Sequence, residues 1–172
     1  IKVCATADAT VCPIDVPALD VSDDMKYTIA ATNVLASIEA QVLVDAPAPT
    51  ADKTQVRVVH FSADTPAVDV LTQDGSATVV DNVAYPNATG YLTLDAGSYD
   101  LKVCADADNT VCPLDPAALD LAAGRSYSVF AIGSLAGDTL TAAVGVDGVA
   151  APATDTQATT QGDPSTTGMP LA

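Results

Sequence analysis

Two short stretches, Lys102-Val103-Cys104-Ala105 and Thr110-Val111-Cys112-Pro113, decide how this chain folds. Both occur 100 positions earlier as well, as Lys2-Val3-Cys4-Ala5 and Thr10-Val11-Cys12-Pro13. Upstream of the later copy lies a stretch, 54–100, that has no counterpart before the earlier copy. The sequence therefore predicts the back half of one repeat at 1–49, a complete repeat at 50–149, and a Thr/Pro/Gln-rich tail or linker at 150–172.

The composition predicts a folded protein with an acidic surface. Of the 172 residues, 49% are hydrophobic, which is enough to build a core. The 22 acidic and 6 basic residues give a net charge of −16, and such a surface repels nucleic acid and anionic membranes. The charge also suits high salt, simple solubility or weak binding of divalent cations, and the sequence does not choose among these.

The chain has no apolar run of about 18 residues, so we expect no membrane insertion. Ile1 falls inside a repeat, so we expect that a signal peptide and further sequence precede it.

The four cysteines form two equally spaced pairs, Cys4 with Cys12 and Cys104 with Cys112. Each pair brackets polar turn formers, which predicts a β-hairpin whose arms are joined by a disulfide. Strand alternation places Cys104 on the solvent face of its strand. The alternatives are free thiols and a metal site, but zinc usually needs four ligands at shorter spacing, and His60 is the only histidine. Disulfides indicate an extracellular or cell-surface protein, with the periplasm as a further location.

Runs of β-forming residues separated by turns fill the complete repeat. About seven short strands in roughly 100 residues predict an all-β fold of immunoglobulin-like β-sandwich repeats. The stretch Ile29–Ala40 contains helix formers, but it aligns with a strand, turn and strand that begin at Val129, so we predict strands in both copies. The stretch Pro116–Leu119 is compatible with one helical turn. The predicted strands are 56–61, 67–71, 78–80, 91–94, the cysteine hairpin, 126–132 and 140–144.

The opening of the complete repeat, Val56–Val70, resembles the motif V-R-x-x-H-x-S-x-D-x-P-x-V-D-V of a secreted tandem-repeat family of unknown function. Later stretches are similar to further signatures of that family: Asn82-Val83-Ala84-Tyr85, Gly90-Tyr91-Leu92, Ala96-Gly97-Ser98-Tyr99 and 127–133. The resemblance covers about 54–149, and 1–45 match the second half of the family's repeat. It implies an exported, immunoglobulin-like β-sandwich with no established enzymatic activity.

Within this motif, His60, Ser62, Asp64 and Asp69 bring together the residue types of a hydrolase. However, His60 and Ser62 lie two apart on one predicted strand, and no nucleophile elbow accompanies them. Asp64 and Pro66 fit turn chemistry instead. We therefore interpret the motif as structural and expect neither catalysis nor a cofactor, with a metal or ligand site at His60 and Asp64 as the alternative.

Two further features suggest modification or binding. The loop Asp106-Ala107-Asp108-Asn109 spaces oxygen ligands as calcium loops can, but it lacks the glycine and distal glutamate of an EF-hand. Asn87-Ala88-Thr89 is a glycosylation sequon.

The half-repeat leads to the functional hypothesis. Its apolar residues belong to positions that should face a core, and its strands would offer open edges to another chain. We therefore expect a structural subunit that self-associates or lies in a tandem array or filament, completed by strands of a neighbouring chain or of a preceding segment. The alternative is an adhesion or ligand-binding module for a glycan, a cation or a surface protein. The residues concerned are Val3, Val11, Leu19, Tyr27, Ile29, Leu35, Val42 and Val44.

Overall fold

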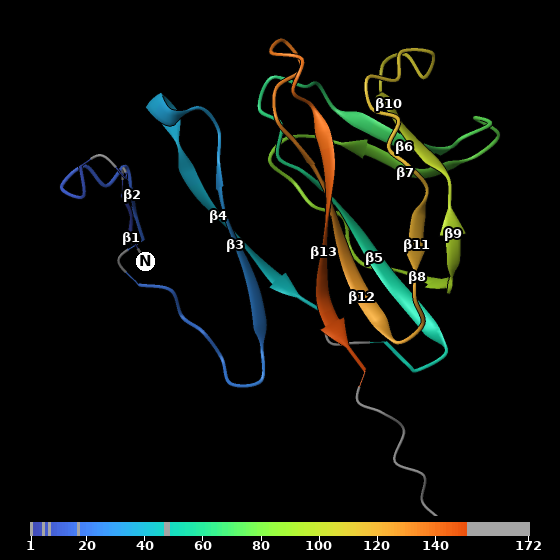
Figure 1. Cartoon of the computed structure of the whole chain (residues 1–172), viewed down its shortest axis with the longest axis horizontal. Helices are drawn as coiled ribbons and strands as arrows, with labels where there is room; N and C mark the ends of the chain where they lie inside the picture. The colour runs from blue at the N-terminus through green and yellow to red at the C-terminus, as the bar shows by residue number, and fades with distance from the viewer. Residues whose placement is uncertain (1, 5, 7, 17, 47–48, 151–172) are drawn as a thin grey trace, which may run out of the picture.

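The computed structural model describes residues 2–4, 6, 8–16, 18–46 and 49–150, and the predicted tail lies outside this part. The described chain is all-β, as predicted (Figure 1). The half-repeat contains β1 (Lys2–Val3), β2 (Ile14–Asp15), β3 (Lys26–Thr32), the 3-10 turn η1 (Leu35–Ser37) and β4 (Glu39–Asp45). The complete repeat contains β5 (Lys53–His60), β6 (Val68–Thr72), β7 (Thr78–Val83), β8 (Leu92–Asp95), β9 (Gly97–Tyr99), β10 (Leu101–Ala105), β11 (Leu119–Leu121), β12 (Arg125–Ile132) and β13 (Thr141–Val149).

The complete repeat is a β-sandwich. Its larger sheet has the order β13-β12-β5-β8 and its smaller sheet the order β10-β6-β7, with β11 and β9 paired separately. The first strand, β5, runs parallel to β12 and places Val58 opposite Val129, whereas the other strand pairs are antiparallel. This order establishes a sandwich but not the immunoglobulin-like topology, in which the first strand does not lie between the penultimate strand and another strand of the same sheet.

Alternating apolar side chains explain why the two sheets pack together. Val68, Val70 and Val80 from the smaller sheet form one buried cluster, against which Val58 and Val103 pack. Val56, Leu121 and Tyr127 form a second. On the opposite face of β5, Arg57 is also buried, at 3% exposure, although that face points away from the sandwich core. Something therefore covers the outer face of the larger sheet.

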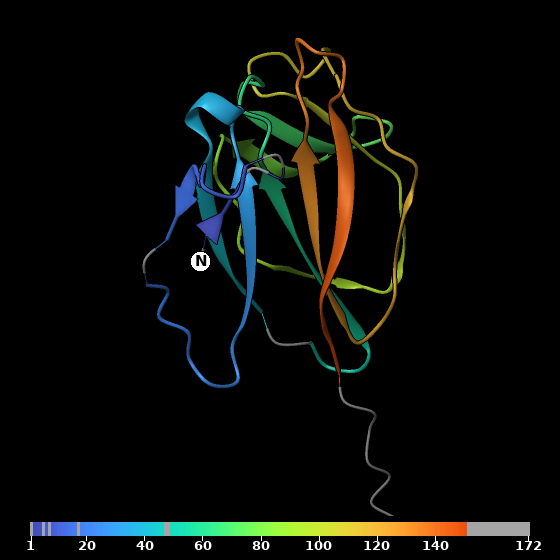
Figure 2. The same cartoon turned by 60° about the vertical axis from the view of Figure 1, so that its left-hand side comes forward.

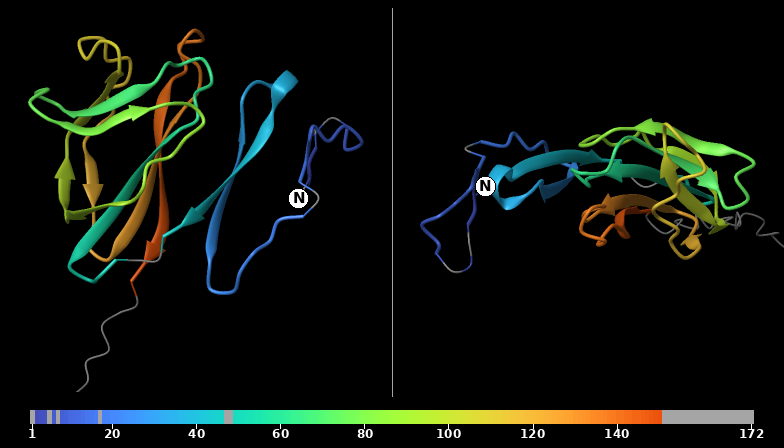
Figure 3. Two further views of the ribbon diagram at one scale, coloured as in Figure 1. Left: turned by 180° about the vertical axis from the view of Figure 1, so that it is seen from behind. Right: turned by 90° about the horizontal axis from the view of Figure 1, so that it is seen from above.

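The half-repeat supplies this cover with its β3–β4 hairpin. The pairing of Ala31 with Ala40 repeats the pairing of Ala131 with Ala142 in β12 and β13, so the two hairpins are equivalent. The β3–β4 hairpin forms a two-stranded sheet of its own (Figures 2 and 3). In Figure 1, β4 and β13, the equivalent strands of the two copies, run in the same direction.

The structure corrects two details of the sequence analysis. Cys104 is fully buried rather than on the solvent face, because the chain after β10 folds back, pairing Leu114 with Val103, and the disulfide holds Cys112 against Cys104. The stretch Pro116–Leu119 contains no helical turn, since Leu119 begins strand β11 and pairs with Tyr99. The predicted strand, turn and strand at Ile29–Ala40 are present as β3, η1 and β4.

Candidate functional site: the joint between the repeats

A buried arginine connects the two repeats. Arg57 donates from Nη2 to Asp45 Oδ1 at 2.5 Å and from Nη1 to the Val44 carbonyl oxygen at 2.9 Å, both in the half-repeat. Its Nε donates to Ser128 Oγ at 2.6 Å within its own repeat. Arg57 and Asp45 are 3% and 7% exposed, so this is a buried ion pair, and each of the three guanidinium nitrogens has a hydrogen-bond partner. Removing either partner of such a pair leaves an uncompensated buried charge.

A second carboxylate stands beside this pair. Asp147 Oδ2 accepts from Ser128 Oγ at 2.6 Å and from the Tyr91 hydroxyl at 2.7 Å. The Tyr91 ring lies 4.8 Å from the Arg57 guanidinium carbon, a cation–π contact. Burial, assisted by the hydrogen bond to Asp147, raises the pKa of Tyr91 to about 12, so the hydroxyl stays protonated and keeps donating.

The hairpin that meets this cluster has an inverted pattern of exposure. Its polar side chains Thr32 and Asp45 are buried against the complete repeat, at 4% and 7% exposure. Its apolar side chains Ile29, Val42 and Val44 are 41%, 36% and 51% exposed. Folded proteins normally bury the apolar face of a sheet. In the complete repeat Val144 and Val146, the equivalents of Val42 and Val44, are 48% and 51% exposed as well, whereas Val129, the equivalent of Ile29, is half-buried. Within the described chain, Ile29 therefore lacks part of the cover that its equivalent has.

The motif residues His60, Ser62 and Asp64 lie together, but in a structural arrangement. His60 is fully buried; its Nδ1 accepts from the Ser62 N–H at 3.3 Å, so its Nε2 donates to the Pro66 carbonyl oxygen at 3.0 Å. Ser62 Oγ donates to the Gly133 carbonyl oxygen at 2.9 Å. Both imidazole nitrogens and the serine hydroxyl therefore have hydrogen-bond partners, in the motif itself and at Gly133.

Asp64 ties the same motif to the β12–β13 loop. It accepts from Ser134 Oγ at 2.6 Å and from the backbone N–H groups of Leu135 and Ala136 at 2.9 and 3.0 Å. These bonds hold the pKa of Asp64 well below its ordinary value, with Ser134 as the largest cause. At the start of this loop, Gly133 has a left-handed φ of +96°, and a Cβ there would collide with the Thr139 carbonyl.

An acidic cluster contains the remaining motif residue, Asp69. One carboxylate oxygen from each of Asp69, Asp81 and Asp106 lies within 4.8 Å of the others. Burial, together with the charges of the other two, raises the pKa of Asp106. Asp69 itself accepts from the Asn82 N–H at 2.8 Å. Asp106 is the residue of the predicted calcium loop, 106–109, that belongs to this cluster.

Asp108 is directed elsewhere: it accepts from Thr110 within its own turn. The oxygen cluster thus differs from the one that the loop spacing suggested, because Asp69 and Asp81 come from β6 and β7.

The remaining predicted residues lie as follows. Cys4 is bonded to Cys12 and Cys104 to Cys112, as their spacing predicted. Asn87 of the sequon is exposed. Within the described residues, no helix is long and apolar enough to cross a membrane.

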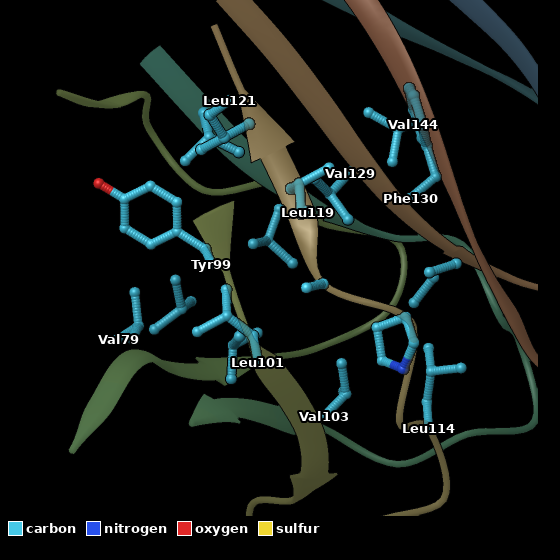
Figure 4. Close-up of a pocket in the computed structure, with 18 of the residues that line it drawn as sticks. Val79, Tyr99, Leu101, Val103, Leu114, Leu119, Leu121, Val129, Phe130 and Val144 are labelled. Atoms are coloured by element: carbon cyan, nitrogen blue, oxygen red, sulfur yellow. The ribbon is translucent and has the colours of Figure 1, made fainter. Parts of the chain in front are cut away.

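A hollow of about 490 Å³ lies between the two sheets of the complete repeat (Figure 4). Valine and leucine side chains such as Val103, Leu114 and Val129 line it, with Tyr99 and Phe130 as its aromatic residues. A chain without tryptophan and with only 4% aromatic residues has few side chains large enough to fill such a space. The hollow is thus a consequence of composition.

The contact between the repeats, in which Arg57 binds Asp45, was not predicted from the sequence. The available signal was a second repeat spacing: Val44-Asp45 recurs as Val146-Asp147, 102 positions later. The paired strands carry equivalent hydroxyl residues, Thr28 and Ser128, which lie opposite Leu43 and Gly145. Thr28 Oγ1 donates to Asp45 at 3.0 Å, just as Ser128 donates to Asp147. A polar pair kept at the end of the last strand in both copies indicates a shared role.

Comparison with known proteins identifies the family. A family described as a domain of unknown function (DUF4397) matches residues 1–71 and 64–161, and the chain belongs to it. No curated protein matches the sequence. Among solved structures, the chain is similar to the C-terminal domain of AlgF from P. aeruginosa, at 22% identity and a TM-score of 0.42, over 55% of this chain and 98% of that one.

Proposed function

We propose that this chain is a non-catalytic, extracellular structural module, a subunit of a surface array or filament. In this proposal the half-repeat is completed by strands from a neighbouring chain or from a preceding segment. The unequal burial of equivalent positions carries the proposal, because Val21 of the half-repeat is 66% exposed, whereas its equivalent Leu121 in the complete repeat is 3% exposed.

Energetics support completion. Fully burying a valine or isoleucine side chain contributes about 1.5–3 kcal/mol. The gain is expected at Val21, Val3 and Ile29, which are 66%, 41% and 41% exposed, because their equivalents Leu121, Val103 and Val129 are buried or half-buried. Covering these three side chains would add an amount comparable with a large part of the net stability of a small domain, about 5–15 kcal/mol. In the complete repeat β5 pairs with β12, whereas no strand of the described chain pairs with the equivalent edge of β3. An unpaired strand edge is a template for another strand.

Export is supported by the disulfides. Both cysteine pairs are bonded, and such bonds persist in oxidising compartments outside the cytosol. The engaged imidazole and hydroxyl of the motif support a non-catalytic role, since they stabilise the loop between β12 and β13.

Intact-mass measurement combined with light scattering on the native material tests the proposal. We expect either assemblies of several chains or a longer chain in which a front half precedes Ile1. Negative-stain images should then show a regular array or filament. A monomer of this mass with a well-protected half-repeat would contradict the proposal.

A second candidate function, divalent cation binding, is favoured by the oxygen cluster of Asp69, Asp81 and Asp106. Calcium would relieve the repulsion that raises the pKa of Asp106. Under this alternative, millimolar calcium raises the Tm of the wild type but not of Asp81→Asn. Equal shifts in both proteins would contradict it.

A further inference from the structure

Equivalent positions of the two repeats face each other across the joint. A hollow of about 440 Å³ is lined by Ala30, Thr32 and Val34 from one copy and by Phe130, Ile132 and Ser134 from the other. Each of these residues therefore lines the same hollow as its counterpart 100 positions away. The polar cluster shows the same arrangement, since Thr28 and Asp45 meet Arg57 from one side and Ser128 and Asp147 lie on the other.

This placement has the symmetry of a two-fold axis that runs along the strands. β4 and β13 run in the same direction, and each copy turns the same face of its hairpin toward the other. In such a pair β3 lies against β12, and β4 lies against β5, which explains why Arg57 on β5 reaches Asp45 on β4. The axis also relates β5 to an empty position beside β3, facing β13 and its Asp147.

We infer that the segment completing the half-repeat adds a strand at the free edge of β3, parallel to it, and that an arginine of this strand pairs with Asp147 as Arg57 pairs with Asp45. The partner is thus a front-half segment of this same repeat type with a Val-Arg strand. The inference rests on the proposed function, because it names the segment that completes the half-repeat.

The complete repeat fixes the register of this strand. Val58 lies opposite Val129 in the parallel pair of β5 and β12, and Ile29 is the equivalent of Val129. The entering valine therefore lies opposite Ile29, and its neighbouring arginine projects onto the face that carries Thr28. There Thr28 can accept from the guanidinium, as Ser128 accepts from Arg57.

Asp147 is suited to receive the second arginine. Two hydroxyls already orient its carboxylate, and among the described residues it forms no ion pair. Lys26 Nζ donates at 3.4 Å to its backbone carbonyl, which shows that β3 and β13 are within side-chain reach. A contact between equivalent faces closes on itself. The repeating unit of an array would therefore be the pair of repeats, joined to other pairs through another surface.

An extended chain tests the inference. A copy of residues 50–100 is placed directly before Ile1, because Leu101, the equivalent of Ile1, follows Asp100 without a gap. We expect hydrogen exchange of the β3 amides to slow at least tenfold relative to the original chain. Exchange that stays as fast would overturn the placement of the strand at this edge.

A double-mutant cycle then tests the ion pair. The arginine of the copied segment is changed to glutamine, alone and together with Asp147→Asn. Each single change should make the β3 amides exchange about tenfold faster again, because hydrogen bonds to charged groups contribute at this level. The double variant should exchange no faster than either single variant, because the ion pair can be lost only once. Arg57→Gln with Asp45→Asn is the matched control cycle. Additive effects at Asp147 would overturn the pairing.

A peptide provides a second route if the extended chain fails to fold. The peptide Lys53–Phe61 is added to the original chain, with a glutamine-for-arginine peptide as its control. Protection of β3 that is weakened by the substitution supports the inference; no protection, or equal protection by both peptides, overturns it. Both experiments also test the proposed function independently of the strand placement. The proposed function is contradicted if the β3–β4 hairpin of the original monomer is already fully protected from hydrogen exchange.

Discussion

Tyr27 and Tyr127 occupy equivalent positions in the half-repeat and in the complete repeat, and they make the same hydrogen bond. Each hydroxyl accepts at 3.1 Å from a backbone N–H five residues earlier, that of Ser22 in one copy and that of Ala122 in the other. The turn inside each disulfide loop is also the same, since Asp8 and Asp108 both accept from the threonine two residues later. Local structure is thus complete in both copies.

The two copies differ in how deeply equivalent side chains are buried. Val21 is 66% exposed, whereas its equivalent Leu121 is 3% exposed. Cys4 is exposed and Cys104 is fully buried. The difference teaches that a back half of this repeat forms its turns and hairpins from local sequence alone, but the front strands β5 to β9 supply the surface that buries its apolar side chains.

The largest effect is expected from breaking the contact between the copies. Arg57→Leu leaves the Asp45 carboxylate buried without its cation, which should lower the free energy of unfolding by about 3–5 kcal/mol. Urea denaturation measures this loss. Arg125→Leu, at an exposed arginine of the same sheet, should change stability by no more than about 0.5 kcal/mol. If both substitutions lowered stability only slightly, Arg57 and Asp45 would not form a buried ion pair.

Equivalent core positions should respond differently. Leu121→Ala creates a cavity in a buried cluster and should cost about 2–5 kcal/mol. Val21→Ala should stay within about 0.5 kcal/mol, because that side chain is already exposed. The same denaturation experiment compares them. A costly Val21→Ala in the isolated chain would mean that the half-repeat has a core of its own.

The two disulfides should differ in the order of their reduction. Each closes a short loop and is expected to contribute about 2–3 kcal/mol. Cys4 is exposed and Cys104 is not, so limiting reductant should open the Cys4–Cys12 bond first. Alkylation followed by peptide mass spectrometry determines the order. Simultaneous opening would count against the difference in burial.

The smallest expected effect is on the stability of the protein at low pH. The folded-state pKa of Asp64 is depressed below its ordinary value of 3.8, so its stabilisation is present above that pH and is lost as the pH falls toward the depressed pKa. Asp64→Asn should remove this part of the acid dependence from the β12–β13 loop, measured by thermal unfolding between about pH 4 and 2. The equivalent loop of the half-repeat, with Asn33 bonded to the next backbone N–H, should not respond. An unchanged acid profile in the variant would contradict the capping role.

Much of the fold follows from local pattern. The cysteine spacing predicted both disulfides, and alternation predicted strands even at Ile29–Ala40, because the second copy resolved the ambiguity. Alternation failed at Cys104, since the chain after β10 folds back and the disulfide holds Cys112 against it. The contact between the two repeats could not be predicted from local sequence patterns. Arg57 and Asp45 are 12 positions apart in sequence, but their contact depends on how two sheets pack face to face.

Residue-resolved hydrogen exchange on the isolated chain tests the central claim most directly. If the half-repeat awaits completion, the amides of β3 and β4 should exchange at least about tenfold faster than those of β12 and β13, although the two hairpins have equivalent backbone pairing. Equal protection of the two hairpins in a chain shown to be monomeric would contradict the account.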